Sequence, residues 1–148
     1  MSKRQQVEEQ AFRYHDGGYH CAEAISKAIM ESYCAEQSAA VPRVASAFGG
    51  GVGRTHEDMC GALSGALLGL GLVLGRSQPN ENWDDLAQMG AELRQAFMAE
   101  TGSTNCAVIL KAFGEQTNMI KCKKLSGKTA GLAAEIIERN RRQAPCPL

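Results

Sequence analysis

Six cysteines are the residues of this 148-residue sequence whose type could support redox or metal chemistry. They form no CxxC or CxxH pair, which counts against a zinc knuckle because its ligands come in close pairs. Cys21, Cys60 and Cys106 are each expected in the first turn of a helix, where unpaired backbone N–H groups and the helix dipole stabilise a thiolate. Cys122 is flanked by lysines, which would favour its thiolate too. Because the thiolate is both the nucleophile and the metal ligand, these four are the candidate catalytic and metal-ligating residues.

The two remaining cysteines lack this electropositive setting. Cys34 is expected near the end of a helix and Cys146 in the C-terminal tail, so we predict that both are bystanders to the chemistry of the other four. Residues 1–10 carry charges with no apolar segment after them, which predicts no secretory signal and a cytoplasmic location. Since the cytoplasm keeps thiols reduced, no standing disulfide is expected.

The periodicity of the apolar residues predicts the fold class. They recur at intervals of three and four, and the alternating runs typical of strands are absent. We therefore expect an all-α, single-domain helical bundle of about six to seven helices over residues 1–148. The helices are expected at residues 5–14, 20–33, 40–48, 57–74, 83–101 and 121–142, with a short helix between a Ser103 or Thr104 cap and Ala112.

The most apolar segment, residues 60–75, contains five glycines among 16 residues. It is shorter than the roughly 20 apolar residues that span a bilayer, so it is expected to be a buried glycine-rich helix and not a membrane span. Each glycine inside a helix costs about 1 kcal/mol relative to alanine, so a close neighbour must compensate. Gly61, Gly65 and Gly69 lie four apart on one side, where another helix, a bound centre or a second subunit could sit. Gly61 and Gly65 are therefore candidate cofactor-binding residues, and a homodimer through this small-residue face is an alternative.

The motif that begins at Cys60 reads CGALSG and matches the pattern CGAxxG. With Cys21 before the motif and Cys106 and Cys122 after it, the chain resembles the redox-active family called C_GCAxxG_C_C. The resemblance extends over residues 14–125. It implies a helical redox protein in which these four cysteines are the signature thiols, and it leaves the redox partner unidentified.

Two mechanisms remain open for the four thiols. In one, pairs of them cycle between dithiol and disulfide, which requires Cα atoms within about 7 Å of each other. In the other, all four ligate one iron–sulfur cluster; without a cluster, no cofactor is expected. Two alternatives belong to other classes. One is a structural or adaptor bundle with inert buried thiols, and the other is a hydrolytic site in which His56 acts as the base for Cys60, four residues later.

The charges of the chain are balanced, with 16 Lys and Arg residues against 16 Asp and Glu residues. Residues 121–142 hold seven basic and two acidic residues, but no aromatic residues of the kind that stack on bases. A solvated helix face is expected there, and no nucleic-acid partner. The GGGVG run at residues 49–53 follows no predicted strand and precedes no Lys-Ser or Lys-Thr pair, which argues against a nucleotide-binding loop.

Overall fold

The computed structural model describes residues 1–141 and Cys146. Within them the chain forms seven α-helices and no strand longer than one isolated bridge, so the prediction of an all-α fold is confirmed. No helix in this described part has both the length and the apolar character needed to cross a membrane. The elements in chain order are α1 (Lys3–Asp16), α2 (Cys21–Tyr33), the 3₁₀ helix η1 (Ala35–Ala40), α3 (Val41–Ala45), the 3₁₀ helix η2 (Ser46–Phe48), α4 (Gly61–Leu74), α5 (Asp84–Thr101), α6 (Cys106–Phe113) and α7 (Ile120–Asn140).

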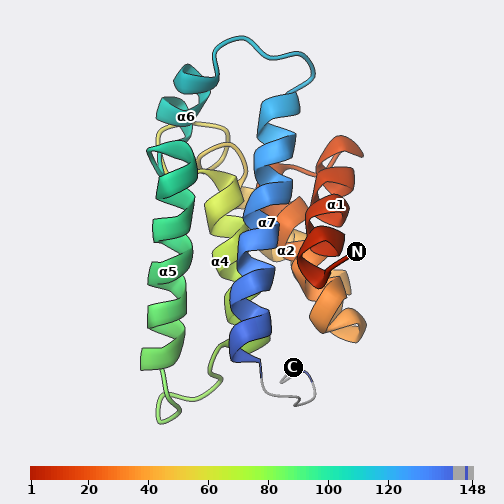
Figure 1. Ribbon diagram of the computed structural model, residues 1–148, viewed down its shortest axis with the longest axis vertical. Coiled ribbons are helices and arrows are strands. Elements are labelled where there is room, and N and C mark those ends of the chain that lie inside the picture. The colour runs from red at the N-terminus through yellow and green to blue at the C-terminus, as the bar shows by residue number, and fades with distance from the viewer. Residues whose placement is uncertain (142–145, 147–148) are drawn as a thin grey trace.

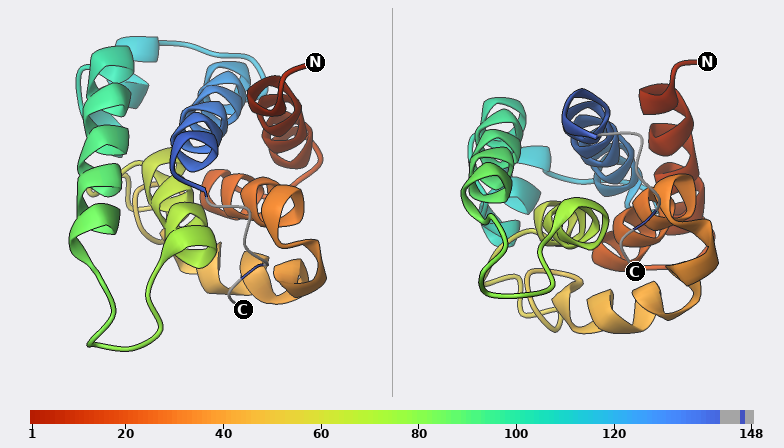
Figure 2. Two further views of the ribbon diagram at one scale, coloured as in Figure 1. Left: turned by 60° about the horizontal axis from the view of Figure 1, so that its bottom comes forward. Right: turned by 90° about the horizontal axis from the view of Figure 1, so that it is seen from below.

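Helix α7 lies at the centre of the bundle and packs against α1, α2, α4 and α5 (Figures 1 and 2). Its small residues Ala130, Ala133 and Ala134 recur on one stripe and are fully buried. Even Lys123 is only 6% exposed, and its Nζ donates to Asp16 Oδ1 at 3.0 Å. The predicted solvated face is nevertheless confirmed for the other described basic residues of this segment, since Lys121, Lys124, Lys128, Arg139 and Arg141 are all exposed. The alanine stripe buries the opposite side of the helix against its neighbours.

The glycine stripe of α4 faces α2, so the predicted buried glycine-rich helix with a close neighbour is confirmed. A Cβ added at Gly65 would lie 2.7 Å from the carbonyl oxygen of Ala22, and one at Gly69 would lie 2.7 Å from Ile29 Cδ1. Gly61 faces the first residue of α2 in the same way. Since α2 of the same chain occupies the stripe, the proposed homodimer face is not available to a second subunit.

Helix α4 begins at Gly61 and not at residue 57 as predicted. The five residues at 50–54 all have positive φ, between 59 and 67°, which an α-helix of L-residues cannot adopt. Met59 then pairs with Asn105 in an isolated antiparallel bridge. Residues 56–58 form bends, with His56 also at positive φ, so no helix forms directly before Cys60, which is the N-cap of α4.

Other helix boundaries also shift. Helix α6 begins at Cys106 because the side chain of Asn105, not of Ser103 or Thr104, accepts the capping hydrogen bond, from the Val108 N–H at 3.2 Å. The single helix predicted over residues 40–48 is divided among η1, α3 and η2. Helix α7 ends at Asn140, and the predicted end at residue 142 lies outside the described residues.

Cys34 and Cys146 form a disulfide with a Cα–Cα distance of 5.4 Å. The prediction of no standing disulfide is therefore wrong, whereas the separation of Cys34 and Cys146 from the four free cysteines agrees with the sequence-based division into two sets. Cys34 caps the C-terminal end of α2, and α7 also ends at that side of the bundle, which brings together residues separated by 112 positions (Figure 1). The pairing depends on how two distant segments pack in the folded chain. The charges near each cysteine in the sequence, which were the basis of the prediction, contain no information about that packing.

Candidate functional site

Each of the four candidate cysteines lies at the start of a different helix. Cys21 and Cys106 are the first residues of α2 and α6, Cys60 is the N-cap of α4, and Cys122 is the third residue of α7. The starts of α4, α6 and α7 lie at the upper end of the bundle in Figure 1. All four cysteines are free thiols. The predicted placement of Cys21, Cys60 and Cys106 at helix starts is confirmed.

The isolated bridge between Met59 and Asn105 fixes two of these cysteines relative to each other. The Cys60 N–H donates to the Thr104 carbonyl at 2.7 Å, and the Cys106 N–H donates to the Asp58 carbonyl at 2.9 Å. Cys60 and Cys106 therefore lie on the same face of the two extended segments, as diagonal neighbours. Such neighbours are about 7–8 Å apart.

The loop at residues 50–54 closes over the helix starts. Val52 adopts φ 67°, which is rare for a β-branched residue, between glycines that adopt such angles easily. A Cβ added at Gly51 would lie 2.6 Å from Cys106 Cβ. The Gly50 backbone N–H donates a hydrogen bond to the Cys21 sulfur. The consecutive positive φ angles at residues 50–54 thus bring the loop backbone into direct contact with two of the four cysteines.

All four cysteines line one cavity of about 320 Å³. Gly61 also lines it, and a Cβ at Gly61 would lie 2.2 Å from Cys21 Sγ, so glycine is needed there to make room for the sulfur. Gly65, the other candidate cofactor-binding glycine, lies against the Ala22 backbone instead. The remaining wall includes His15, His20, Gly50, Arg54, His56, Ala62, Ile109, Leu110, Met119, Leu125 and Ser126.

Burial raises the pKa of all four thiols. The pKa of Cys60 rises to about 12 and that of Cys106 to about 11, and in both cases the charges of neighbouring cysteines raise it further. Backbone N–H groups at the helix starts lower the pKa of Cys21 and Cys60, as predicted, but burial outweighs them. The four thiols are therefore protonated at neutral pH in the free protein, because burial outweighs the predicted effect of the helix starts.

Gln116 is a site residue that the sequence did not reveal. Its Nε2 donates to Cys122 Sγ at 3.3 Å, while its Oε1 accepts the backbone N–H groups of Lys121 at 2.9 Å and Cys122 at 3.2 Å. This hydrogen bond lowers the pKa of Cys122, although burial raises it more. The lysines that were expected to assist Cys122 point elsewhere: Lys121 Nζ donates to the Phe113 carbonyl and Lys123 pairs with Asp16. A glutamine in a loop carries no sequence signal for such a contact.

His15 lies in the cavity wall with its Nδ1 2.9 Å from Ser126 Oγ. Burial, assisted by the positive charge of Lys123, lowers its pKa from 6.5 to about 4. The folded state thus favours neutral His15, so the stability that this residue contributes is complete above pH 6.5 and is lost as the pH falls toward 4.

We expect the free energy of unfolding to fall less between pH 7 and 4.5 in His15→Gln than in the unmodified protein. Urea unfolding at several pH values measures it, and an equal pH dependence in the two proteins would contradict it.

Two simpler chemistries find little support in the geometry. Within the described residues, no group of three or more His, Cys, Asp or Glu side chains is arranged to hold a single metal ion. His56 and Cys60 do line the same cavity, as the hydrolytic alternative requires. No hydrogen bond joins them, however, in the part of the chain that the structure describes, and the pKa of Cys60 is raised rather than lowered.

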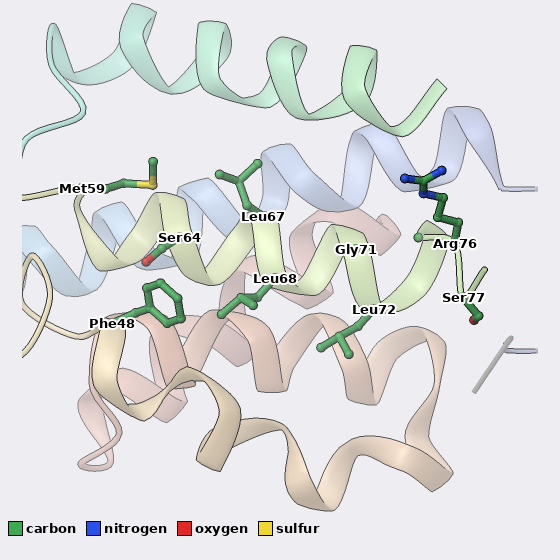
Figure 3. A pocket seen from close by; sticks show the side chains of 10 residues that line it. Phe48, Met59, Ser64, Leu67, Leu68, Gly71, Leu72, Arg76 and Ser77 are labelled. Atoms are coloured by element: carbon green, nitrogen blue, oxygen red, sulfur yellow. The ribbon is translucent and has the colours of Figure 1, made fainter. Parts of the chain in front are cut away.

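A second hollow, of about 550 Å³, follows the outer side of α4 (Figure 3). Leu67, Leu68 and Leu72 form most of its apolar lining, and Met59, directly before Cys60, lies at one end. Arg76, at the other end, donates to the carbonyls of the following loop. The described lining of this groove includes no cysteine, histidine or carboxylate, so the candidate redox and metal-binding residues are those of the cysteine cavity.

Comparison with known proteins agrees with this assignment. A family model described as "Putative redox-active protein (C_GCAxxG_C_C)" matches residues 19–136. The matched range contains the four free cysteines and Cys34, and it ends before Cys146. No curated protein and no solved structure matches the chain significantly.

Proposed function

Because the chain belongs to the redox-active C_GCAxxG_C_C family, we propose that it is a redox protein in which Cys21, Cys60, Cys106 and Cys122 ligate an iron–sulfur cluster. The observation that carries the proposal is that four free thiols, from four separate helix starts, line one cavity of about 320 Å³. Four cysteine thiolates are the usual ligand set of such clusters. When bound, a cluster would supply one-electron transfer.

The residues around the sulfurs fit this role. Metal ligation requires thiolates and releases their protons, so the raised pKa values describe the free protein and make cluster binding pH-dependent. The Gly50 N–H donates to Cys21 and the Gln116 side chain donates to Cys122. Hydrogen bonds to ligand sulfurs and limited solvent access are the means by which a protein sets a cluster's reduction potential.

Protein purified without oxygen should be coloured and contain both iron and acid-labile sulfide. Replacing any one of the four cysteines by serine should strongly lower the iron content, since a four-thiolate site has no spare ligand. The double variant Cys34→Ser/Cys146→Ser is the matched control: purified at a temperature at which circular dichroism shows it folded, it should keep its iron content, because these residues form a separate disulfide. Iron-free protein, or iron retained in all four single variants, would refute the cluster.

Dithiol–disulfide exchange is the second candidate, and the Met59–Asn105 bridge favours it for one pair. Cys60 and Cys106 are diagonal neighbours across this bridge, and at the usual separation of about 7–8 Å for such neighbours a small backbone movement would bring them within disulfide distance. In this reaction the two thiols would lose two protons and two electrons to a disulfide oxidant, which becomes two thiols. Mild oxidation with glutathione disulfide should then yield a Cys60–Cys106 linked peptide by mass spectrometry, and a random set of linkages would contradict this pairing.

We propose the cytoplasm as the compartment because it keeps free thiols of this kind reduced. The Cys34–Cys146 disulfide would then be in contact with cellular dithiol reductants. Its state in protein alkylated at the moment of cell lysis tests the compartment. A fully reduced pair would indicate a reducing environment, and a fully oxidised pair would count against the cytoplasm.

A further inference from the structure

A polar cavity of about 460 Å³ lies beside the cysteine cavity. The two cavities share His20, Gly50 and Arg54 as lining residues. The rest of the polar cavity is formed by the hydroxyl-bearing Ser46 and by backbone at Gly49 and Gly53. An entering molecule that reaches the polar cavity therefore meets the same side chains that border the thiols.

The charges around this polar cavity favour an anion. Arg54 makes no ion pair or side-chain hydrogen bond with any described residue, so its guanidinium is available to a ligand. A guanidinium presents paired N–H donors that match the oxygens of a carboxylate, sulfate or phosphate group. The carboxylate of Glu23 is not part of the lining, and its two oxygens accept the His20 backbone N–H at 3.0 Å and the Ser46 hydroxyl at 2.8 Å, so Arg54 and not Ser46 is the donor free for a ligand.

The backbone leaves room for a ligand beside one particular thiol. Gly53 lines this cavity and is exposed, and a Cβ added there would meet nothing within 4 Å. His20 directly precedes Cys21, and the Gly50 N–H donates to the Cys21 sulfur. A group held by Arg54 and His20 would consequently lie beside Gly50 and His20, the residues that contact or directly precede Cys21.

We propose that the polar cavity is an oxyanion-binding site that presents a small anionic molecule to Cys21. That the bound molecule would react with Cys21 as a substrate rests on the proposed redox function. That the cavity binds an oxyanion does not. The chemistry recognised is an oxygen-bearing anionic group, and the probes below distinguish carboxylate from sulfate and phosphate.

Alkylation of Cys21 by two reagents of different charge tests the site. Iodoacetate is an anion and iodoacetamide is neutral, and both react with the same thiolate, so the ratio of their rates reports the local charge and not the thiol pKa. We expect this ratio to fall about fivefold in Arg54→Gln, the effect of one unit charge about 4 Å away in water. Arg94→Gln, which removes an exposed arginine of α5, should leave the ratio unchanged. An unchanged ratio in Arg54→Gln would overturn the proposal.

Direct binding of the anions provides the second measurement. Sulfate should slow the labelling of Cys21 by iodoacetate more than sodium chloride of equal ionic strength does. In NMR spectra, sulfate should also shift the amide resonances of Gly50 and Gly53 in the unmodified protein but not in Arg54→Gln. Acetate and phosphate, used in the same way, identify the preferred group. If none of the three anions shifts these resonances, the site does not exist, even where Cys21 is too slow to label. Iron content is measured separately, so a protein without a cluster can still show the anion site, and failure of one proposal is distinguishable from failure of the other.

Discussion

Replacing both cysteines of the disulfide, in Cys34→Ser/Cys146→Ser, should lower the free energy of unfolding by about 4–5 kcal/mol. The disulfide links residues 112 positions apart, and a cross-link over so long a loop removes much of the conformational entropy of the unfolded chain. The chain-entropy relation gives this magnitude for a loop of that length. Urea unfolding of the oxidised protein and of the variant measures the difference.

A dithiol reductant supplies the control for this prediction. It should destabilise the unmodified protein to the level of the double variant and leave the variant itself unchanged, because the other four cysteines are already free thiols. If the variant and the oxidised protein unfold at the same urea concentration, the disulfide does not constrain the unfolded state as proposed.

Gly65→Leu should destabilise the fold by about 3 kcal/mol or prevent folding, because inserting a side chain into a closely packed interface causes overpacking. The added Cβ alone would lie 2.7 Å from both the Cα and the carbonyl oxygen of Ala22, which are backbone atoms and cannot rotate away. Chemical denaturation measures the loss. Far-ultraviolet circular dichroism shows whether the variant remains helical.

Gly71→Ala is the matched control on the same helix. A Cβ at Gly71 meets nothing within 4 Å, so this substitution removes the flexibility of a helical glycine without a clash. It should stabilise the protein by up to about 1 kcal/mol. A neutral Gly65→Leu, or equal losses in the two variants, would show that the close approach of α2 and α4 is not what the glycines provide.

The sequence by itself determined the features that follow from local rules. Intervals of three and four between apolar residues predicted the helices, since one face of a helix must be buried. The energetic cost of helical glycine predicted that Gly65 has a close neighbour, and α2 is that neighbour. Turn and cap signals placed Cys21, Cys60 and Cys106 at helix starts, within a few residues of where the structure has them.

Only the tertiary structure decided which of these local features meet. The four helix starts line one cavity because their helices pack at the same end of the bundle, and that burial is what raises the thiol pKa values against the effect of the helix N–H groups. The same packing directs Lys123 to Asp16 and leaves Gln116 as the side chain that contacts Cys122. Cys34 and Cys146 pair across 112 positions for the same reason. Desolvation and distance are properties of the packed chain, so residue type and spacing could predict the candidate thiols but not their protonation or their partners.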